Sequence, residues 1–305
     1  MRFDASDQAD GSQVEDRRGG GFRFPGGGMG AGAGGLGLIG LLIVGAIKLL
    51  GGDVVTSSDS SQGQTQRQPS PGDPRGGPGA APPVGGSCAG VTSATDQARF
   101  IACVETNVQS FWTRQLPQSG AAYHPAHLVL FTEATPSGCG EASATTGPFY
   151  CPPDQKVYLD LGFFDELHKR FHAKGGDFAE AYVVAHEYGH HVQKLLGIEG
   201  RMREAERAHP SDRNALSVRL ELQADCFAGV WGHSAYEKGK VAADEIALAL
   251  DAAASVGDDR IQKQMRGRVN PESFTHGSAA ERQKWFETGM DSGDPKRCDT
   301  FSGQL

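Results

Sequence analysis

The run Ala185-His-Glu-Tyr-Gly-His-His191 constrains this 305-residue chain more than any other feature, because its spacing has a mechanical meaning on a helix. Residues four apart on an α-helix project from the same face, so His186 and His190 can bind one metal ion. Glu187 is rotated from His186 by about 100°, which places its carboxylate where it can act as general base on a metal-bound water. The alternative is a solvated helix face that carries two histidines.

The residues on either side of this run predict a buried helix. Gly175 and Gly176 break the chain, Asp177 is the expected N-cap, and Gly197 is a natural stop. Apolar residues recur between them at helical spacing, at Phe178, Ala181, Tyr182, Ala185, Val192, Leu195 and Leu196. We therefore expect the two histidines to lie at the floor of a cleft.

A catalytic zinc site usually takes three protein ligands and leaves one position for water. The metzincin pattern requires Gly and His at the positions that Gln193 and Leu196 occupy here, so that pattern is excluded. Downstream, Glu221 and Asp225 are spaced i, i+4 along a second helix that ends near Gly239. Glu221 is the expected third ligand, and Asp225 is expected to accept a hydrogen bond from a ligand histidine and fix its tautomer. The alternative is two ordinary acids on an amphipathic helix.

From about Cys88 to the C-terminus, the chain resembles the bacterial putative neutral zinc metallopeptidase family. The resemblance is carried by three segments in the expected order, Val184-Ala-His-Glu-Tyr-Gly-His-His-Val-Gln193, Glu221-Leu-Gln-Ala-Asp-Cys-Phe-Ala-Gly-Val-Trp231 and Pro271-Glu-Ser-Phe-Thr-His-Gly-Ser278. It implies a zincin-like, gluzincin-type peptidase domain that binds one catalytic Zn²⁺ through His186, His190 and Glu221, with Glu187 as base.

The third segment is also similar to the Thr-His-Pro segment, with an Arg downstream, of membrane-associated gluzincins. In this chain Thr275-His276-Gly277 precedes a helix, Ser278 to Phe286, that contains Arg282. The resemblance makes His276 the first candidate to stabilise the oxyanion of the tetrahedral intermediate. His233 on the second helix is the runner-up. The alternative for either residue is a surface or capping histidine.

The remaining patterns predict an α+β domain with a small β-sheet. Ser93 is a candidate N-cap for a helix that reaches about Arg114. Strands are expected at His127–Thr132 and Lys156–Leu161, and the second could be an edge strand that binds substrate backbone. Further helices are expected at Ala242–Ala254 and Ala279–Glu287.

Composition divides the chain into four parts. We predict a disordered cytoplasmic tail at 1–23, a single transmembrane anchor at 24–50, a flexible Pro/Gly/Ser/Gln linker at 51–87, and the zinc metallopeptidase domain at 88–305. No charged residue lies between Phe24 and Ile47, a length sufficient to span a bilayer. A secretory signal peptide and a disordered Gly-rich tract are the alternatives.

Basic residues predict the orientation of this anchor. Arg17, Arg18 and Arg23 precede it and Lys48 alone follows, so the N-terminus is expected in the cytoplasm. The chain would then be a single-pass protein of the bacterial inner membrane, with its catalytic domain in the periplasm or outside the cell.

Cysteine content agrees with export. Six cysteines allow 15 pairings, and sequence proximity favours Cys88–Cys103 and Cys139–Cys151, which leaves Cys226–Cys298. The alternative is reduced, buried thiols in a cytosolic protein. The net charge of −8, without a basic stripe, argues against a nucleic-acid partner.

Two function classes follow from these patterns. The first is a membrane-anchored zinc endopeptidase whose substrates are exported proteins or peptides. The second is a non-catalytic, zinc-stabilised interaction domain of the cell envelope. Glu187 favours the enzyme, because a structural zinc site needs no general base.

Overall fold

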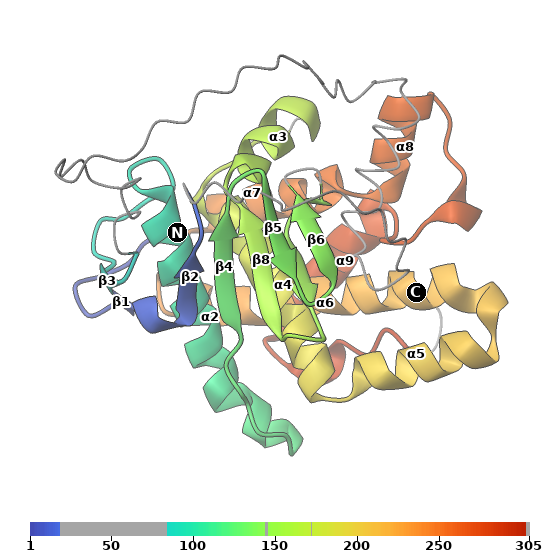
Figure 1. Cartoon of the computed structure of the whole chain (residues 1–305), viewed down its shortest axis with the longest axis horizontal. Coiled ribbons are helices and arrows are strands. Elements are labelled where there is room, and N and C mark those ends of the chain that lie inside the picture. The colour runs from blue at the N-terminus through green and yellow to red at the C-terminus, as the bar shows by residue number, and fades with distance from the viewer. Residues whose placement is uncertain (19–83, 144–145, 172, 303–305) are drawn as a thin grey trace, which may run out of the picture.

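The computed structural model describes residues 1–18, 84–143, 146–171 and 173–302, which form a mixed α+β fold (Figure 1). The described helices are α2 (Gln97–Gln115), α3 (Gly162–Phe171), α4 (Asp177–Leu195), α5 (Ile198–Ala208), α6 (Arg213–Glu237), α7 (Ala243–Ser255), α8 (Asp258–Arg266) and α9 (Ala279–Ser292). The described strands are β1 (Gln8–Ala9), β2 (Val14–Asp16), β3 (Gly86–Ser87), β4 (His127–Phe131), β5 (Ala134–Ser137), β6 (Gly140–Ser143), β7 (Phe149–Cys151) and β8 (Lys156–Asp160).

The largest described sheet has the strand order β2-β4-β8-β7. β4 pairs in parallel with both β2 and β8, while β7 pairs with β8 in the antiparallel direction. The two predicted strands are therefore present as β4 and β8. β8 lies between β4 and β7, so both of its edges are occupied and the prediction that it is a substrate-binding edge strand is wrong.

The N-terminal residues belong to the folded domain. In β2, Val14 lies opposite Leu128 of β4, and in β1, Ala9 lies opposite Gly86 of β3. Phe3 packs edge-on against Phe100 of α2, with ring centroids 6.0 Å apart. The prediction of a disordered tail is thus wrong for residues 1–18. Strands of two and three residues, such as β1 and β2, are too short to show an alternating pattern in the sequence.

This packing also corrects the predicted orientation. Lys156 of β8 forms an ion pair with Glu15 of β2 at 2.8 Å, and Lys240 binds the carboxylates of Asp4 and Asp7. Residues 1–18 pack against the described part of 84–302 as one folded unit, so the two must share one side of any membrane. A cytoplasmic tail opposite an exported catalytic domain is incompatible with these contacts.

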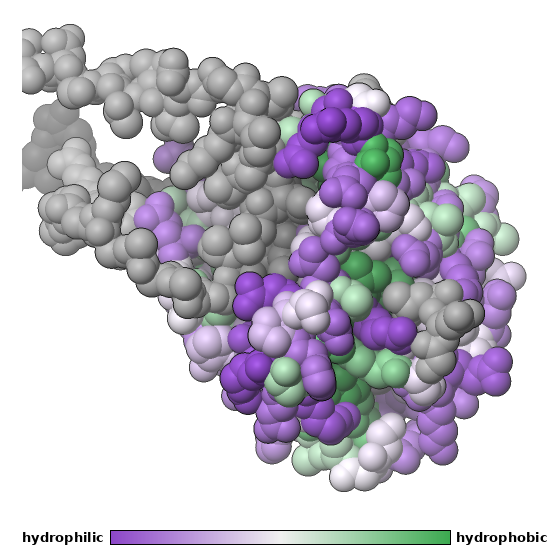
Figure 2. Space-filling view, turned by 90° about the vertical axis from the view of Figure 1, so that its right-hand side faces the viewer, coloured by the Kyte–Doolittle hydropathy of each residue, from purple (hydrophilic) through white to green (hydrophobic). Residues whose placement is uncertain are grey.

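The predicted membrane span, 24–50, and most of the predicted linker lie outside the described residues. Within the described part of the chain, no helix combines the length and apolar character that a bilayer crossing requires. The face in Figure 2 is mainly hydrophilic, with small apolar patches between polar side chains. Among the described large hydrophobic residues, Tyr236 and Val269 are the exposed ones.

Small residues bring the long helices close together behind the sheet. A Cβ on Gly229 of α6 would lie 2.1 Å from the carbonyl oxygen of Phe286, and a Cβ on Gly289 of α9 would lie 2.0 Å from that of Cys226. Only glycine permits this approach of two helix backbones. α6 is therefore held in direct backbone contact with α9.

Three disulfides join the cysteines in the pairs that sequence proximity favoured, Cys88–Cys103, Cys139–Cys151 and Cys226–Cys298. The third spans 72 positions and ties α6 to the C-terminal segment. Closing a loop of this length constrains the unfolded chain strongly.

Two predicted helix caps are wrong. Asp96 caps α2, because its carboxylate accepts the backbone N–H of Arg99. Ser93 instead donates its hydroxyl to Asp177, at 2.7 Å. Asp177 is the first residue of α4, whose N-cap is Gly176. The two polar residues bond each other and so join the starts of two helices.

Candidate metal centre

The candidate metal centre lies where α4 and α6 are in contact. Gly189 lies between Glu187 and His190, and a Cβ there would be 3.0 Å from the carbonyl oxygen of Ala224 on α6. A larger side chain would separate the two helices. The glycine inside the H-E-x-x-H run therefore sets the distance between the histidines of α4 and the acidic residues of α6.

His186, His190 and Glu221 form one group whose potential ligand atoms all lie within 4.8 Å of one another. Nε2 of His186 is 3.2 Å from Oε2 of Glu221, and Nε2 of His190 is 3.5 Å from Oε1. Zinc bonds of about 2.0–2.2 Å in tetrahedral geometry would place neighbouring ligand atoms about 3.3–3.6 Å apart. The spacing therefore fits a single zinc ion between three ligands.

Unpaired polar atoms point to the same conclusion. Nε2 of His186 and Oε2 of Glu221 are buried and, although 3.2 Å apart, make no hydrogen bond of acceptable geometry. Oε1 of Glu187 is also buried and has no hydrogen-bond partner within the described residues. Buried polar groups without partners are costly, so a donor set like this one suits a cation. Burial disfavours ionisation of Glu221, yet the neighbouring His190 and His186 hold its pKa well below the ordinary value.

Asp225 organises the side of the site that faces α9. Its Oδ1 accepts hydrogen bonds from Nδ1 of His186 at 2.8 Å and from the Tyr182 hydroxyl at 2.5 Å. Arg282 of α9 donates to both carboxylate oxygens, each at 2.8 Å. Although burial opposes it, Arg282 lowers the pKa of Asp225 to about 2. The ionised Asp225 keeps the proton of His186 on Nδ1, which leaves Nε2 free for a metal.

Glu187 lies beside the ligands and is itself buried. Burial raises the pKa of its carboxyl group above the ordinary value, although the nearby His186 and His190 oppose the rise. A carboxylate with a raised pKa accepts a proton more readily, as a general base must.

His276 is held at the start of α9 by Asp258 of α8. Nδ1 of His276 is 3.3 Å from Oδ1 of Asp258, and Oδ2 accepts the backbone N–H groups of Thr275 and His276 at 2.6 and 2.7 Å. Nε2 of His276 is buried and has no partner among the described groups. His276 also helps to lower the pKa of Glu221, so it lies within electrostatic reach of the ligand group.

The backbone conformation of Gly277 explains why this chain has glycine where the Thr-His-Pro segment of gluzincins has proline. Gly277 has φ +89°, a conformation that proline cannot adopt because its ring fixes φ near −65°. A Cβ here would also approach Val218 and Leu222 of α6 to 3.3 and 3.2 Å. The backbone at this position therefore requires glycine.

His233, the runner-up for the oxyanion role, lies elsewhere. Twelve residues of helix, or about 18 Å of rise, separate it from Glu221. Its Nδ1 is 2.7 Å from the carbonyl oxygen of Met290, and its Nε2 is 3.4 Å from Glu237. Its ring nitrogens are engaged at the far end of α6, so the assignment to the site was wrong.

Sequence reasoning missed three residues that support the site. Tyr182 lies four positions before His186 and Gln193 three positions after His190, so helical spacing could have indicated both. Gln193 accepts a hydrogen bond from Nδ1 of His190 at 2.8 Å. Asp258 belongs to a separate helix, and no local pattern connects it to His276.

Two histidines and a glutamate from adjacent helices form a group that could hold a metal ion, with an additional buried glutamate beside them, in the arrangement that the H-E-x-x-H motif predicts. The model of the family described as "Putative neutral zinc metallopeptidase" matches residues 1–301, and the chain belongs to this family. The match includes the N-terminal strands, in agreement with their place in the sheet.

Relatives in two bacterial species support this assignment. The uncharacterized protein YpfJ of Escherichia coli K12 is 41% identical over 318 aligned positions, which cover 100% of both chains. The uncharacterized protein Rv2575 of Mycobacterium tuberculosis H37Rv is 47% identical over 221 positions, covering 68% of this chain and 73% of its own length. No solved structure matches this chain.

Proposed function

We propose that this protein is a zinc-dependent endopeptidase that hydrolyses peptide bonds of exported proteins or peptides. The observation that carries the proposal is the buried, unpaired carboxylate oxygen of Glu187 beside the group of His186, His190 and Glu221. A zinc ion held by these three residues would lower the pKa of a bound water to about 7.

Glu187 performs the proton transfers in this mechanism. Its free Oε1 accepts the proton of the attacking water, and the raised pKa of the carboxyl group favours that step. The same carboxyl group then donates the proton to the leaving amine.

His276 stabilises the charge that develops on the carbonyl oxygen of the substrate. Asp258 accepts from Nδ1 of His276 and orients the ring, while Nε2 has no other partner among the described groups. To donate to the substrate oxygen, Nε2 must carry a proton as well, so this role requires the imidazolium form of His276. Removing one such donor typically lowers kcat by about a hundredfold or more.

The decisive experiment compares the full chain with its Glu187→Gln variant. Zinc content and cleavage of casein or a peptide library are measured for both proteins. We expect one zinc per chain in each and cleavage by the parent alone. If the variant cleaves as fast as the parent, the peptidase proposal fails, and equal zinc content without cleavage by either would favour the zinc-stabilised interaction domain.

A second comparison tests the oxyanion role. His276→Gln is expected to lower kcat by about a hundredfold with little change in KM. His233→Gln is the matched control, because His233 binds Met290 at the far end of α6. Equal kcat values for the two variants would contradict the role of His276.

We further propose that the whole folded unit acts outside the cytoplasm, attached to the membrane through residues 24–50. Three disulfides support export. The exposed positions Ala5 and Gln118, each replaced by Cys, are expected to react equally with a membrane-impermeant maleimide in spheroplasts. Labelling of position 118 alone would contradict the shared compartment, and labelling of neither would contradict export.

A further inference from the structure

A chain of buried amide groups leads from His190 away from the metal centre. Oε1 of Gln193 is 2.8 Å from Nδ1 of His190, and Nε2 of Gln193 donates to the backbone carbonyl of Leu220 at 2.7 Å. The second N–H of Gln193 points to Oε1 of Gln223, at 3.1 Å. Nε2 of Gln223 in turn donates to the carbonyl oxygen of Cys298, at 2.8 Å.

The backbone carbonyl groups of Leu220 and Cys298 fix the direction of every hydrogen bond in this series of amide groups. A backbone carbonyl oxygen can only accept, so the amide nitrogen of Gln193 must face Leu220 and its oxygen must face His190. An oxygen acceptor next to Nδ1 of His190 requires the proton on that nitrogen. Nε2 of His190 is then bare and able to bind a metal.

The outer amide is oriented in the same way. The carbonyl of Cys298 accepts from Gln223, which directs Oε1 of Gln223 toward Gln193. Gln193 thereby uses both N–H groups and its oxygen, so it is a fully satisfied buried amide. Reversing either amide would bring two acceptors or two donors together, which would cost the buried hydrogen bonds.

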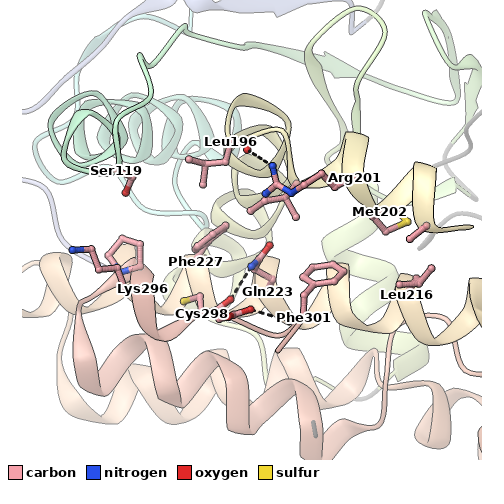
Figure 3. Close-up of a pocket in the computed structure, with 14 residues that line it drawn as sticks. Ser119, Leu196, Arg201, Met202, Leu216, Gln223, Phe227, Lys296, Cys298 and Phe301 are labelled. Carbon is pink, nitrogen blue, oxygen red and sulfur yellow. Dashed lines mark hydrogen bonds between the residues drawn. The ribbon is translucent and has the colours of Figure 1, made fainter. Parts of the chain in front are cut away.

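The outer end of this chain is anchored by the C-terminal segment. Cys298 is joined to Cys226 of α6 by a disulfide, and the Thr300 hydroxyl donates to the carbonyl of Arg219 at 2.6 Å. Figure 3 shows Gln223 bonded to Cys298 at the wall of a cavity of about 490 Å³. The C-terminal segment therefore contributes a fixed acceptor to a network that ends at a metal ligand.

The two histidines are thus oriented by different chemistry. Nδ1 of His186 donates to a carboxylate that Arg282 compensates, whereas Nδ1 of His190 donates to a neutral amide. We propose that Gln193 and Gln223 are positioning residues that set the tautomer and ring orientation of His190, with the disulfide-tied carbonyl of Cys298 as their anchor. This inference rests on the proposed zinc site.

The test measures the zinc dissociation constant of the full-length protein by competition with a chromogenic chelator. Partners of this kind typically contribute 10–100-fold to metal affinity. We expect zinc affinity to fall about 10–100-fold in Gln193→Leu and by a smaller factor in Gln223→Leu. Gln109→Leu is the matched control, because Gln109 is a buried glutamine that bonds Glu105, Tyr123 and Ala126 instead. It is expected to bind zinc like the parent.

A second readout reports the tautomer directly. Long-range ¹H–¹⁵N spectra of the parent are expected to show a proton on Nδ1 of His190, and an Nδ1 without a proton would overturn the proposal. Parent-like zinc affinity in both Gln193→Leu and Gln223→Leu would also overturn it. If Gln193→Leu does not fold, the zinc affinity of Gln223→Leu alone tests the proposal.

Failure of the underlying zinc site would look different. Glu221→Ala removes a proposed ligand, so it must abolish zinc binding if the site is correct. A parent that binds no zinc, or a Glu221→Ala variant that binds it normally, would refute the proposed function. A parent that binds zinc and loses it in Glu221→Ala, with no effect of either glutamine variant, would refute only the positioning role.

Discussion

The contact between α6 and α9 gives a prediction whose magnitude follows from the structure. In Gly289→Ala, the new Cβ would lie 2.0 Å from the carbonyl oxygen of Cys226 and 2.8 Å from the backbone nitrogen of Val230. Ordinary contact begins near 3.4 Å, so the helices must separate by more than 1 Å. Both opposing atoms belong to the backbone, and neither can rotate away.

Overpacking of this kind costs about 1–3 kcal/mol, and the upper end applies because two helix backbones must move. Alanine recovers up to about 1 kcal/mol through its higher helix propensity. We therefore expect Gly289→Ala to lower the free energy of unfolding by about 2 kcal/mol. Zinc affinity should fall as well, because Arg282 lies two turns earlier on α9 and bonds Asp225 beside Cys226.

Urea denaturation followed by circular dichroism measures this change. Gly200→Ala on α5 is the matched control, because its Cβ would meet nothing within 4 Å. That substitution is expected to be neutral or stabilising by roughly 0.5 kcal/mol. A Gly289→Ala protein as stable as the parent would refute the close packing of α6 and α9.

Other predictions concern buried charge and the metal. Arg282→Met should lower the free energy of unfolding, measured by urea denaturation, by about 3–5 kcal/mol, because Asp225 would keep a buried charge without its partner. A loss below about 1 kcal/mol would contradict the role of Arg282 in compensating that charge. Burial raises the pKa of Glu105 to about 7, so the folded protein retains a proton that the unfolded chain releases near pH 4.5. The stability that this retained proton contributes is complete below pH 4.5 and is lost as the pH rises through 7. Denaturation across that pH range measures the loss, and in Glu105→Gln the fall in the free energy of unfolding should be smaller by on the order of 3 kcal/mol. Removal of zinc by a chelator should lower Tm in the parent but leave Tm unchanged in Glu221→Ala, which differential scanning calorimetry can compare.

The helices of the candidate metal centre could be predicted because their signals are local. His186 and His190, and likewise Glu221 and Asp225, are spaced i, i+4, so periodicity alone placed each pair on one helix face. The distance between α4 and α6 could not be predicted in the same way. It depends on Gly189 meeting Ala224, a contact between segments that sequence periodicity does not connect.

The parts that were not predicted involve short or long-range elements. β2 is three residues long, and its role depends on pairing with β4 more than 110 positions away. Asp258 reaches His276 from the start of α8, a short and strongly polar helix that lies 18 positions earlier in the chain. The partners of both elements are set by tertiary packing, which local patterns do not encode.

The most direct test of the account is a crystal structure of the full chain with zinc, using anomalous scattering at the zinc absorption edge. One peak is expected within about 2.2 Å of Nε2 of His186, Nε2 of His190 and a carboxylate oxygen of Glu221. A zinc peak elsewhere, or no peak between these three side chains, would contradict it.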